Sequence, residues 1–268
     1  MESAGAQVRD RSVLRLVVTE PALLLGAGRA LMLQVAHPSV AQGVADHSDF
    51  RDRPLPRLFG TLDFLTIVAL GTDEEADRIG AIVRGVHDHI TGPGYCGNDP
   101  ELQVWVNATL IDAALLVYEE ILHSPSGDLA ARYVEQAAMV ADVLGCPPGS
   151  QPADLESFRA YMDRMVNSLE VSGTGREVAA AVLSARGLWF LWPALALNRF
   201  ITTGLLPERL RAQFGMTWSP GRERLLWFLL RTGAFCYLLV PGRLRRSPQY
   251  LTIRASRRRV ARRAAAHR

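Results

Sequence analysis

Histidine is the residue type best placed to do chemistry in this sequence, which contains His37, His47, His87, His89, His123 and His267. His87 belongs to a series with Ile79, Val83 and Ile90, in which successive positions are four, four and three residues apart. This spacing places the four side chains on one face of a helix. Burial on that face favours the neutral imidazole, whose nitrogen can bind a metal. From spacing alone, a core histidine hydrogen-bonded to a backbone carbonyl is the favoured interpretation, and metal ligation is the alternative. His89 faces another side and is expected to be exposed.

Two further positions place polar groups on helix faces. Arg57 and Thr61 are four residues apart and share one face, where a guanidinium beside a hydroxyl could polarise dioxygen or anchor a carboxylate. A surface arginine beside a capping threonine is the alternative. His37 follows Leu33 by four residues on an apolar face, and it is interpreted as a structural ligand, a substrate contact or a core polar group.

Several common kinds of active site are excluded by the residues present. All 30 basic residues are arginine, so no lysine can act as a base, form a Schiff base or bind a metal. No Ser-His-Asp, His-Glu-x-x-His or phosphate-loop motif can be read. The Gly26-Ala-Gly28 segment lacks the third glycine and the strand context of a dinucleotide site. Cys96, Cys146 and Cys236 lack any paired or metal-like spacing, which fits a reducing compartment.

Helical spacing and capping residues predict an all-α protein with one helical domain. Thr72 and Glu75 form a capping-box pattern, and Asp99-Pro100 is typical of a helix start. Asn107 lies within a predicted helix, where asparagine is a poor helix former, and this hints at a buried polar contact. We predict helices over residues 22–45, 56–71, 73–90, 100–122, 128–144, 154–169, 175–185, 207–214 and 220–240, with a polar loop at 46–56.

Charge divides the chain at Glu223, the last acidic residue. Residues 224–268 carry a net charge of +12, against −9 for residues 1–223. Such a basic segment could contact an anionic membrane surface or nucleic acid, although a solvated terminal helix is favoured. The absence of a compact helix-turn-helix argues against nucleic acid. The polar N-terminus and the short apolar run from Leu225 to Val240 predict a cytoplasmic protein, with peripheral contact to the inner face of the membrane left open.

Taken together, the order of these segments resembles a known family. They are Gly26-Ala-Gly-Arg-Ala-Leu-Met-Leu-Gln-Val-Ala-His37-Pro38, Gly43-Val-Ala-Asp-His47, Arg57-Leu-Phe-Gly-Thr61, Gly71-Thr72, Val86-His87, Trp105-Val-Asn-Ala-Thr-Leu110, Pro152-Ala-Asp-Leu-Glu-Ser-Phe158 and Leu205-Leu-Pro-Glu-Arg-Leu-Arg211. Over roughly residues 20–215 the sequence is similar to the latex-clearing rubber oxygenases and the MpaB-type oxygenase of the mycophenolic acid pathway. The combined pattern is specific, whereas any one segment would be weak.

The resemblance implies a globin-like helical core that binds haem b. By position, the proximal iron ligand falls on His87 and the distal pair on Arg57 and Thr61, and His37 is included among the cofactor contacts. Relatives can carry a distal lysine immediately before the threonine, where this sequence has Gly60. An open sixth coordination position, ready for dioxygen, is therefore expected. Many short relatives have histidine where Asn107 stands, so the role of that position, like that of His47, is left open.

The leading hypothesis is a haem-dependent oxygenase that acts on a lipophilic, unsaturated substrate, isoprenoid or another natural product, with dioxygen bound trans to His87. Residues 1–223 would form the oxygenase-like domain. Residues 224–268 would add an apolar helix and an arginine-rich tail that packs on the domain or extends from it. Two alternatives are a haem-free enzyme that catalyses a rearrangement in an apolar cavity, and a non-enzymatic haem- or lipid-binding protein. They differ in metal content and in vesicle binding.

Overall fold

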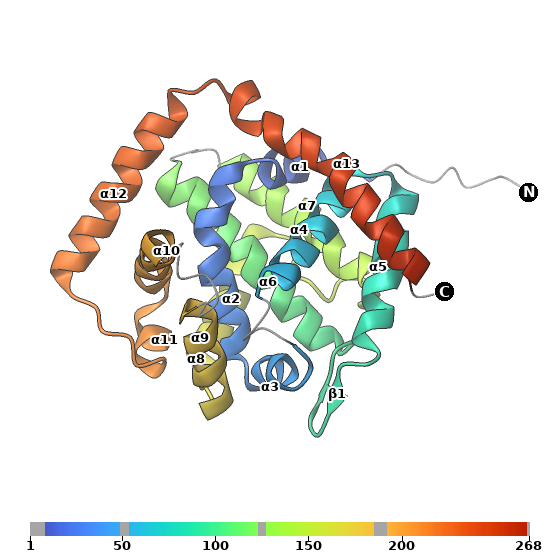
Figure 1. Ribbon diagram of the computed structural model, residues 1–268, viewed down its shortest axis with the longest axis horizontal. Coiled ribbons are helices and arrows are strands. Elements are labelled where there is room, and N and C mark those ends of the chain that lie inside the picture. Colours follow the sequence, from blue (N-terminus) through green and yellow to red (C-terminus); the bar gives the residue numbers. More distant parts are fainter. Residues whose placement is uncertain (1–8, 49–53, 123–126, 185–191, 267–268) are drawn as a thin grey trace, which may run out of the picture.

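Helices α2 (Ala27–Ala36) and α6 (Pro100–Leu116) cross at the centre of the protein and make its most extensive helix contact. The computed structural model describes residues 9–48, 54–122, 127–184 and 192–266, without the side chains of 54–58, 184, 192, 247–252 and 261–266. The expected all-α fold is confirmed (Figure 1). The other elements are α1 (Ser12–Val18), η1 (Pro21–Gly26), α3 (Pro38–His47), α4 (Pro54–Leu70), α5 (Asp73–His87), β1 (Thr91–Gly92), β2 (Tyr95–Cys96), η2 (Val117–Ile121), α7 (Gly127–Val143), α8 (Leu155–Ser168), α9 (Gly173–Ser184), α10 (Trp192–Leu205), α11 (Glu208–Gln213), α12 (Pro220–Leu238) and α13 (Gly242–Ala266).

The main core forms around α6, which is buried on most of its sides. Trp105 and Ile111 are almost fully buried there and pack in one cluster with Leu33 of α2, Val134 of α7 and Phe158 of α8. A helix that is apolar on all sides is typical of such a central position. Asn107 is buried within α6, and its amide donates to Ala137 O at 3.2 Å and to Gln151 Oε1 at 3.1 Å. The expected buried polar contact is therefore present, and it joins α6 to α7 and to the loop before α8.

The predicted helix over 22–45 is three elements. A 3-10 turn (η1) comes first, and the chain then bends at His37, whose extended backbone (ψ 121°) ends α2 and begins α3. Pro38 explains this break, because proline disfavours helical backbone in the residue before it. The predicted 73–90 helix ends at His87, and the segment after it forms the short antiparallel pair of β1 and β2. The predicted helix to Leu122 continues past Leu116 as a π-helical turn, η2.

Gly26 at the end of η1 and Gly28 at the start of α2 allow a close approach to neighbouring helices, which is the physical role of the Gly26-Ala-Gly28 segment. A Cβ at Gly26 would lie 2.9 Å from Ala113 O of α6. A Cβ at Gly28 would overlap the buried Thr202 side chain of α10.

We expect Gly28→Ala to destabilise the protein by about 2 kcal/mol, because the added methyl overpacks the contact with Thr202. Gly85→Ala is the matched control within α5, since a Cβ there meets nothing within 4 Å, and it should instead stabilise by up to about 1 kcal/mol through helix propensity. Urea denaturation measures both changes. Equal effects of the two substitutions would contradict the packing argument, and adding Thr202→Ala should recover part of the loss at Gly28.

Among the described residues, no single helix combines the length and apolar composition that a membrane span needs. One bent pair, Ser12–Val18 with Pro21–Ala36, meets both criteria together across a 69° bend. Val13, Leu14 and Val17 of this pair, together with Leu33, are buried in the protein core.

Candidate functional site

The hairpin of α4 and α5 carries three of the four site residues that the sequence predicts. Gly71 and Thr72 join the two helices, so the start of α4 and the end of α5 lie at the same, open end of the hairpin. Arg57 and Thr61 lie on the first half of α4, and His87 is the last residue of α5. Thr61 and His87 are half-buried, while the side chain of Arg57 lies outside the described residues.

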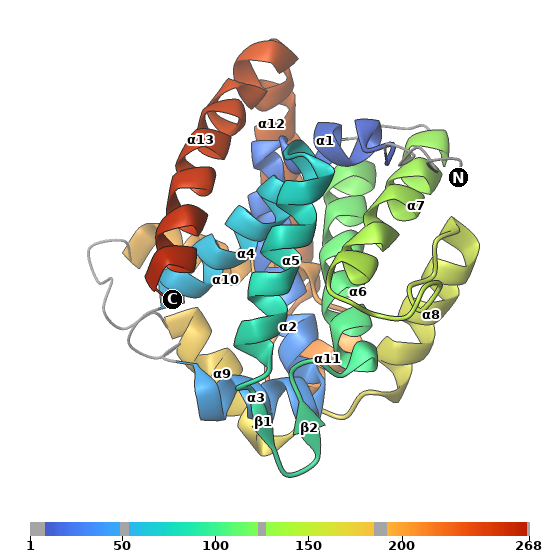
Figure 2. The same ribbon diagram turned by 90° about the vertical axis from the view of Figure 1, so that its right-hand side faces the viewer.

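Packing between α4 and α5 is tight near the turn and looser at the open end. Near the turn, Ile67 and Val68 of α4 are buried in one cluster with Ala76 and Ile79 of α5. At the open end, Phe59 of α4 and Val86 of α5 are each 49% exposed. The two helices separate as they leave their common turn (Figure 2). The end that holds Thr61 and His87 is therefore the less tightly packed end of the hairpin.

The residues that flank the short β-hairpin on both sides brace His87. The amide of Ile90 donates to His87 O at 2.9 Å, and a Cβ at Gly97 would lie 3.2 Å from the Cβ of His87. The Asn98 side chain donates to Arg84 O at 3.0 Å, which ties the segment after β2 to the last turn of α5. The Nδ1 atom of His87 is buried. The imidazole thus lies at a helix end braced by a loop, with one ring nitrogen away from solvent.

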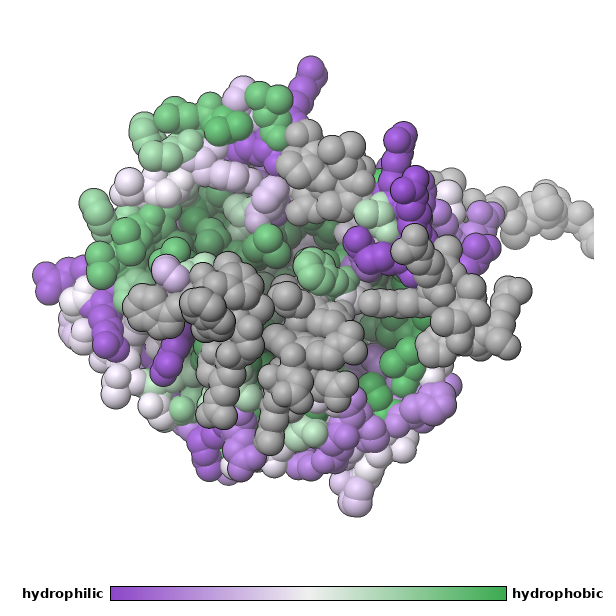
Figure 3. Space-filling view, viewed as in Figure 1, coloured by the Kyte–Doolittle hydropathy of each residue, from purple (hydrophilic) through white to green (hydrophobic). Residues whose placement is uncertain are grey.

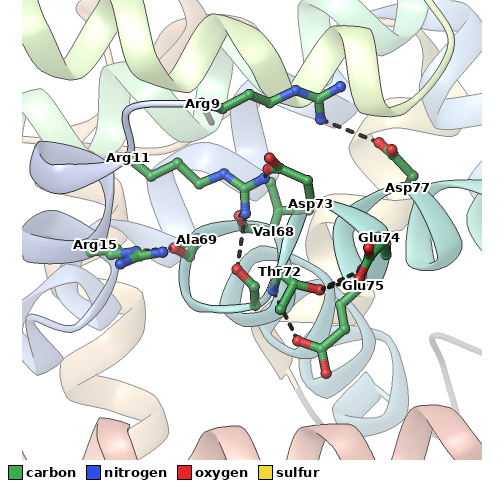
Figure 4. Close-up of polar contacts among 11 residues, drawn as sticks. Arg9, Arg11, Arg15, Val68, Ala69, Thr72, Asp73, Glu74, Glu75 and Asp77 are labelled. Atoms are coloured by element: carbon green, nitrogen blue, oxygen red, sulfur yellow. Dashed lines mark hydrogen bonds and ion pairs between the residues drawn. The ribbon is translucent and has the colours of Figure 1, made fainter. Parts of the chain in front are cut away.

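Arg11, which immediately precedes α1, and Arg15 within α1 hold the turn of the hairpin (Figure 4). Arg11, whose side chain is 2% exposed, donates from Nη1 to Val68 O at 2.9 Å and to Gly71 O at 3.1 Å, and pairs with Asp73. Arg15 Nε donates to Ala69 O at 3.0 Å. Carbonyls at a helix C-terminus have no partner within their helix, so these guanidinium groups satisfy the end of α4. Arg11 and Arg15 are site-supporting residues that the sequence reasoning missed.

The predicted capping box completes this turn on the α5 side. Glu75 N donates to Thr72 Oγ1 at 3.2 Å, and Thr72 N donates to Glu75 Oε2 at 3.0 Å. The guanidinium of Arg257 on α13 also binds Glu75, and this bond holds the pKa of the Glu75 carboxyl below its ordinary value. The turn is therefore joined to both α1 and α13.

Helix α13 also contacts α4 directly, two residues beyond Thr61. The Asp63 carboxylate is 3% exposed, and Arg259 binds it in a forked pair with Nε to Oδ2 at 2.8 Å and Nη2 to Oδ1 at 2.5 Å. Ser256 Oγ donates to Oδ1 of the same carboxylate at 2.7 Å. Forked pairs of this kind combine charge with fixed geometry. The arginine-rich segment, expected as a solvated helix, instead positions the site hairpin through part of its length.

His37 lies on a different pair of helices, at the junction of α2 and α3, and it is half-buried. Helices α2 and α3 pack mainly on α6, α9 and α10, while α3 also touches β2, which follows the hairpin of His87. Within the described part of the chain, Nδ1 of His37 is buried without a hydrogen-bond partner. Burial lowers the pKa of His37, against the opposing effect of Asp99 and Glu101. The ring is therefore neutral at pH 7 and has a nitrogen available for a ligand.

The lowered pKa of His37 predicts that the protein loses stability on acidification. His37 binds a proton more readily in the unfolded chain than in the folded protein. The free energy of unfolding should therefore be highest above pH 6.5 and should fall as the pH drops from 6.5 toward the lower pKa that His37 has in the folded protein. The slope from this one group is at most about 1.4 kcal/mol per pH unit. Between pH 7.5 and pH 5, the melting temperature of the wild type should fall more steeply with decreasing pH than that of His37→Gln. His89→Gln, a change of an exposed histidine, should retain the wild-type slope.

His47 has a structural position at the end of α3. Its Nε2 lies 3.1 Å from both Thr91 O and Tyr95 Oη, and Tyr95 Oη donates to Asp46 Oδ2 at 2.7 Å. Because the carbonyl can only accept, Nε2 carries the proton. This cluster attaches the short β-hairpin to α3. His89, expected to be exposed, is so, and its Nδ1 contacts Gly85 O at 2.9 Å.

A single nitrogen ligand is the metal-binding feature that these residues offer. Within the described ranges, no three His, Cys, Asp or Glu side chains gather as a group that could hold a bare metal ion. Haem requires one or two axial ligands from the protein, because the macrocycle supplies four nitrogens. His87, at the less tightly packed end of the hairpin, is a residue type that can supply one such ligand.

Comparison with known proteins gives both a family and relatives. Residues 14–235 match the family described as ER-bound oxygenase mpaB/B'/Rubber oxygenase, catalytic domain. Uncharacterized proteins of Mycobacterium tuberculosis and Mycobacterium bovis are each 30% identical over 235 residues, which cover 82% of this chain and 91% of theirs. No solved structure matches the chain.

The family match spans the elements from α1 into α12, and so includes the whole hairpin with Arg57, Thr61 and His87. It confirms the resemblance drawn from the sequence and extends it at both ends. The name of the family describes oxygenases, and the two relatives add no activity of their own. The chain belongs to the family of the MpaB-type and rubber oxygenase catalytic domains.

Proposed function

We propose that this protein is a haem b-dependent oxygenase that acts on a lipophilic, unsaturated substrate. The observation that carries the proposal is the placement of His87 and Thr61 on the two helices of one hairpin, toward its less tightly packed end, within a chain of this oxygenase family. The substrate class rests on the family alone, and an isoprenoid is the first candidate.

The residues present fit one face of a haem. His87 has a buried ring nitrogen at a braced helix end, and a neutral imidazole there would hold the iron. Apolar side chains at the same end, Phe59 and Val86, are half-exposed and would pack against the macrocycle. His37, neutral and with an available Nδ1, is proposed as a further polar contact of the cofactor or substrate.

The distal roles fall to Arg57 and Thr61. The guanidinium of Arg57 is permanently charged and can only donate hydrogen bonds, whereas the Thr61 hydroxyl can donate or accept. Both would orient dioxygen and exclude other small ligands from that side. Gly60 carries no side chain that could compete for the iron. The haem, when bound, supplies the redox-active iron that activates dioxygen.

Two measurements test this function. Protein expressed with iron and the haem precursor 5-aminolevulinate should show a Soret band and close to one iron per chain. It should also consume dioxygen when squalene, a polyunsaturated isoprenoid probe, is added in detergent. Folded protein without a Soret band would contradict haem binding. Conversion of squalene without oxygen uptake would favour the haem-free rearrangement instead, and haem content without any turnover would favour a carrier.

A further inference from the structure

Helix α12 presents an apolar face to solvent. Its inner side, with Leu226, Leu230 and Ala234, packs into the main core. Its outer side exposes large apolar residues to an unusual degree, and this outer face is defined by Leu225 (50% exposed), Phe228 (65%), Leu229 (43%), Phe235 (66%), Leu238 (44%), Leu239 (69%) and Val240 (42%). The turn into α13 continues it with Leu244 (64%). Hydrophobic atoms along the left and upper edges of Figure 3 mark this region.

Arginines lie along one edge of the outer face. Arg224 and Arg231 are seven residues apart, as are the neighbouring Phe228 and Phe235, so on α12 the two pairs run as parallel rows. Both arginines are exposed, and both line a groove of about 410 Å³ together with Glu223, Trp227 and Phe228. The Glu223 carboxylate of this groove already accepts hydrogen bonds from the indole nitrogens of Trp218 and Trp227. Arg243 is exposed just beyond the helix. The outer face is thus apolar in the middle and positively charged at its edge.

Many arginines of α13 are already engaged with the protein itself. Arg246 Nε lies 3.3 Å from Oε2 of Glu20, a carboxylate that is 1% exposed, and Arg245 lies 3.9 Å from the same oxygen. Arg257 and Arg259 bind the hairpin of α4 and α5. Three carboxylates, Glu20, Glu75 and Asp63, therefore offset most of the charge of these four arginines within the fold. A membrane contact of the C-terminal region should therefore depend on α12 more than on the arginine-rich helix.

We propose that the outer face of α12 docks on the surface of a membrane that contains anionic lipids. Apolar side chains flanked by arginine are the pattern of helices that lie in the interface, with the apolar side inserted and the cations at the headgroups. Exposed apolar patches on this scale mark interaction sites. This inference holds whether or not the protein binds haem.

Charge decides between a membrane and a second copy of the chain as the occupant. The sequence from 224 to 268 contains twelve arginines and no acidic residue. In a two-fold symmetric dimer the same patch meets itself, so the arginines of both copies would gather in one interface, at a cost in binding. Anionic headgroups neutralise the same arginines. The charge pattern therefore fits a lipid surface and opposes self-association.

Flotation of the full-length protein with phosphatidylcholine vesicles, with or without 30 mol% phosphatidylglycerol, tests the proposal. Wild-type protein should float with the anionic vesicles, and less so at high salt. Phe228→Gln/Phe235→Gln should lower the partition coefficient by at least about tenfold, because each phenylalanine loses its insertion into the apolar layer. Arg224→Gln/Arg231→Gln should lower it about fivefold per arginine.

Matched controls use residues outside α12. Leu24→Gln/Leu197→Gln removes two apolar side chains of similar exposure (49% and 50%) from η1 and α10, and Arg78→Gln/Arg164→Gln removes two exposed arginines of α5 and α8. Both controls should float like wild type. Circular dichroism checks the fold of each variant. Equal flotation of the α12 variants and wild type overturns the proposal. A second contrary result would be wild-type protein that does not bind vesicles and sediments as a dimer, together with a Phe228→Gln/Phe235→Gln variant that sediments as a monomer.

Discussion

Replacing His87 by alanine is expected to abolish the Soret band and to lower the iron content more than tenfold. The imidazole at the end of α5 is the proposed axial ligand, and alanine has no atom that can replace its bond to the iron. The ring is only half-buried, so the fold should persist and circular dichroism should be unchanged. The Soret-to-280-nm ratio of protein purified in parallel with wild type measures the effect.

His89→Ala is the matched control, because it removes an exposed histidine only two residues away. It should leave the Soret band in place. Added imidazole should restore part of the band in His87→Gly, since free imidazole can enter the space left by the side chain. A wild-type spectrum in His87→Ala would rule out this ligand assignment and would make His37 the next candidate ligand.

Arg11→Met should destabilise the protein by about 3 kcal/mol. The substitution keeps a long apolar stem but removes the donors to Val68 O and Gly71 O and the partner of Asp73, and buried acceptors left without donors cost about 1–3 kcal/mol each. Urea denaturation measures the loss. Asp73 is partly exposed at 38%, so water compensates for part of its lost ion pair.

Arg9→Met is the control for this second prediction. Arg9 pairs with Asp77 at 3.2 Å, but both side chains are exposed, so the loss should stay below about 1 kcal/mol. Similar losses at the two positions would contradict the role of Arg11 at the hairpin turn. Since Arg11 lies at the turn and His87 at the open end, the folded fraction of Arg11→Met should keep a wild-type Soret band.

Features that depend on a few neighbouring residues could be predicted from the sequence. The capping box of Thr72 and Glu75 and the cap at Asp99 are confirmed, because a cap is set by side chains within one helical turn. The buried contact of Asn107 was inferred from its poor helix propensity. The break at His37 was missed, although Pro38 carries the signal for it.

Features that join distant parts of the chain could not be predicted. Arg11 contacts Val68 O across 57 residues, and Arg259 contacts Asp63 across 196. Spacing within one helix carries no information about such distant partners. For this reason the sequence alone favoured a solvated helix for the arginine-rich segment. The separation of α4 and α5 at their open end is likewise a property of tertiary packing. The family resemblance, rather than the spacing, directed attention to His87.

The ion pairs of α13 also set an order of events during synthesis. Glu20 and Asp63 belong to the first quarter of the chain, but their partners Arg246 and Arg259 leave the ribosome 226 and 196 residues later, respectively. Until then both carboxylates resist burial, because an unpaired charge is costly in the protein interior. The α4–α5 hairpin should therefore reach its final packing only after α13 has emerged. Nascent chains arrested before residue 245 should remain open to protease at this hairpin.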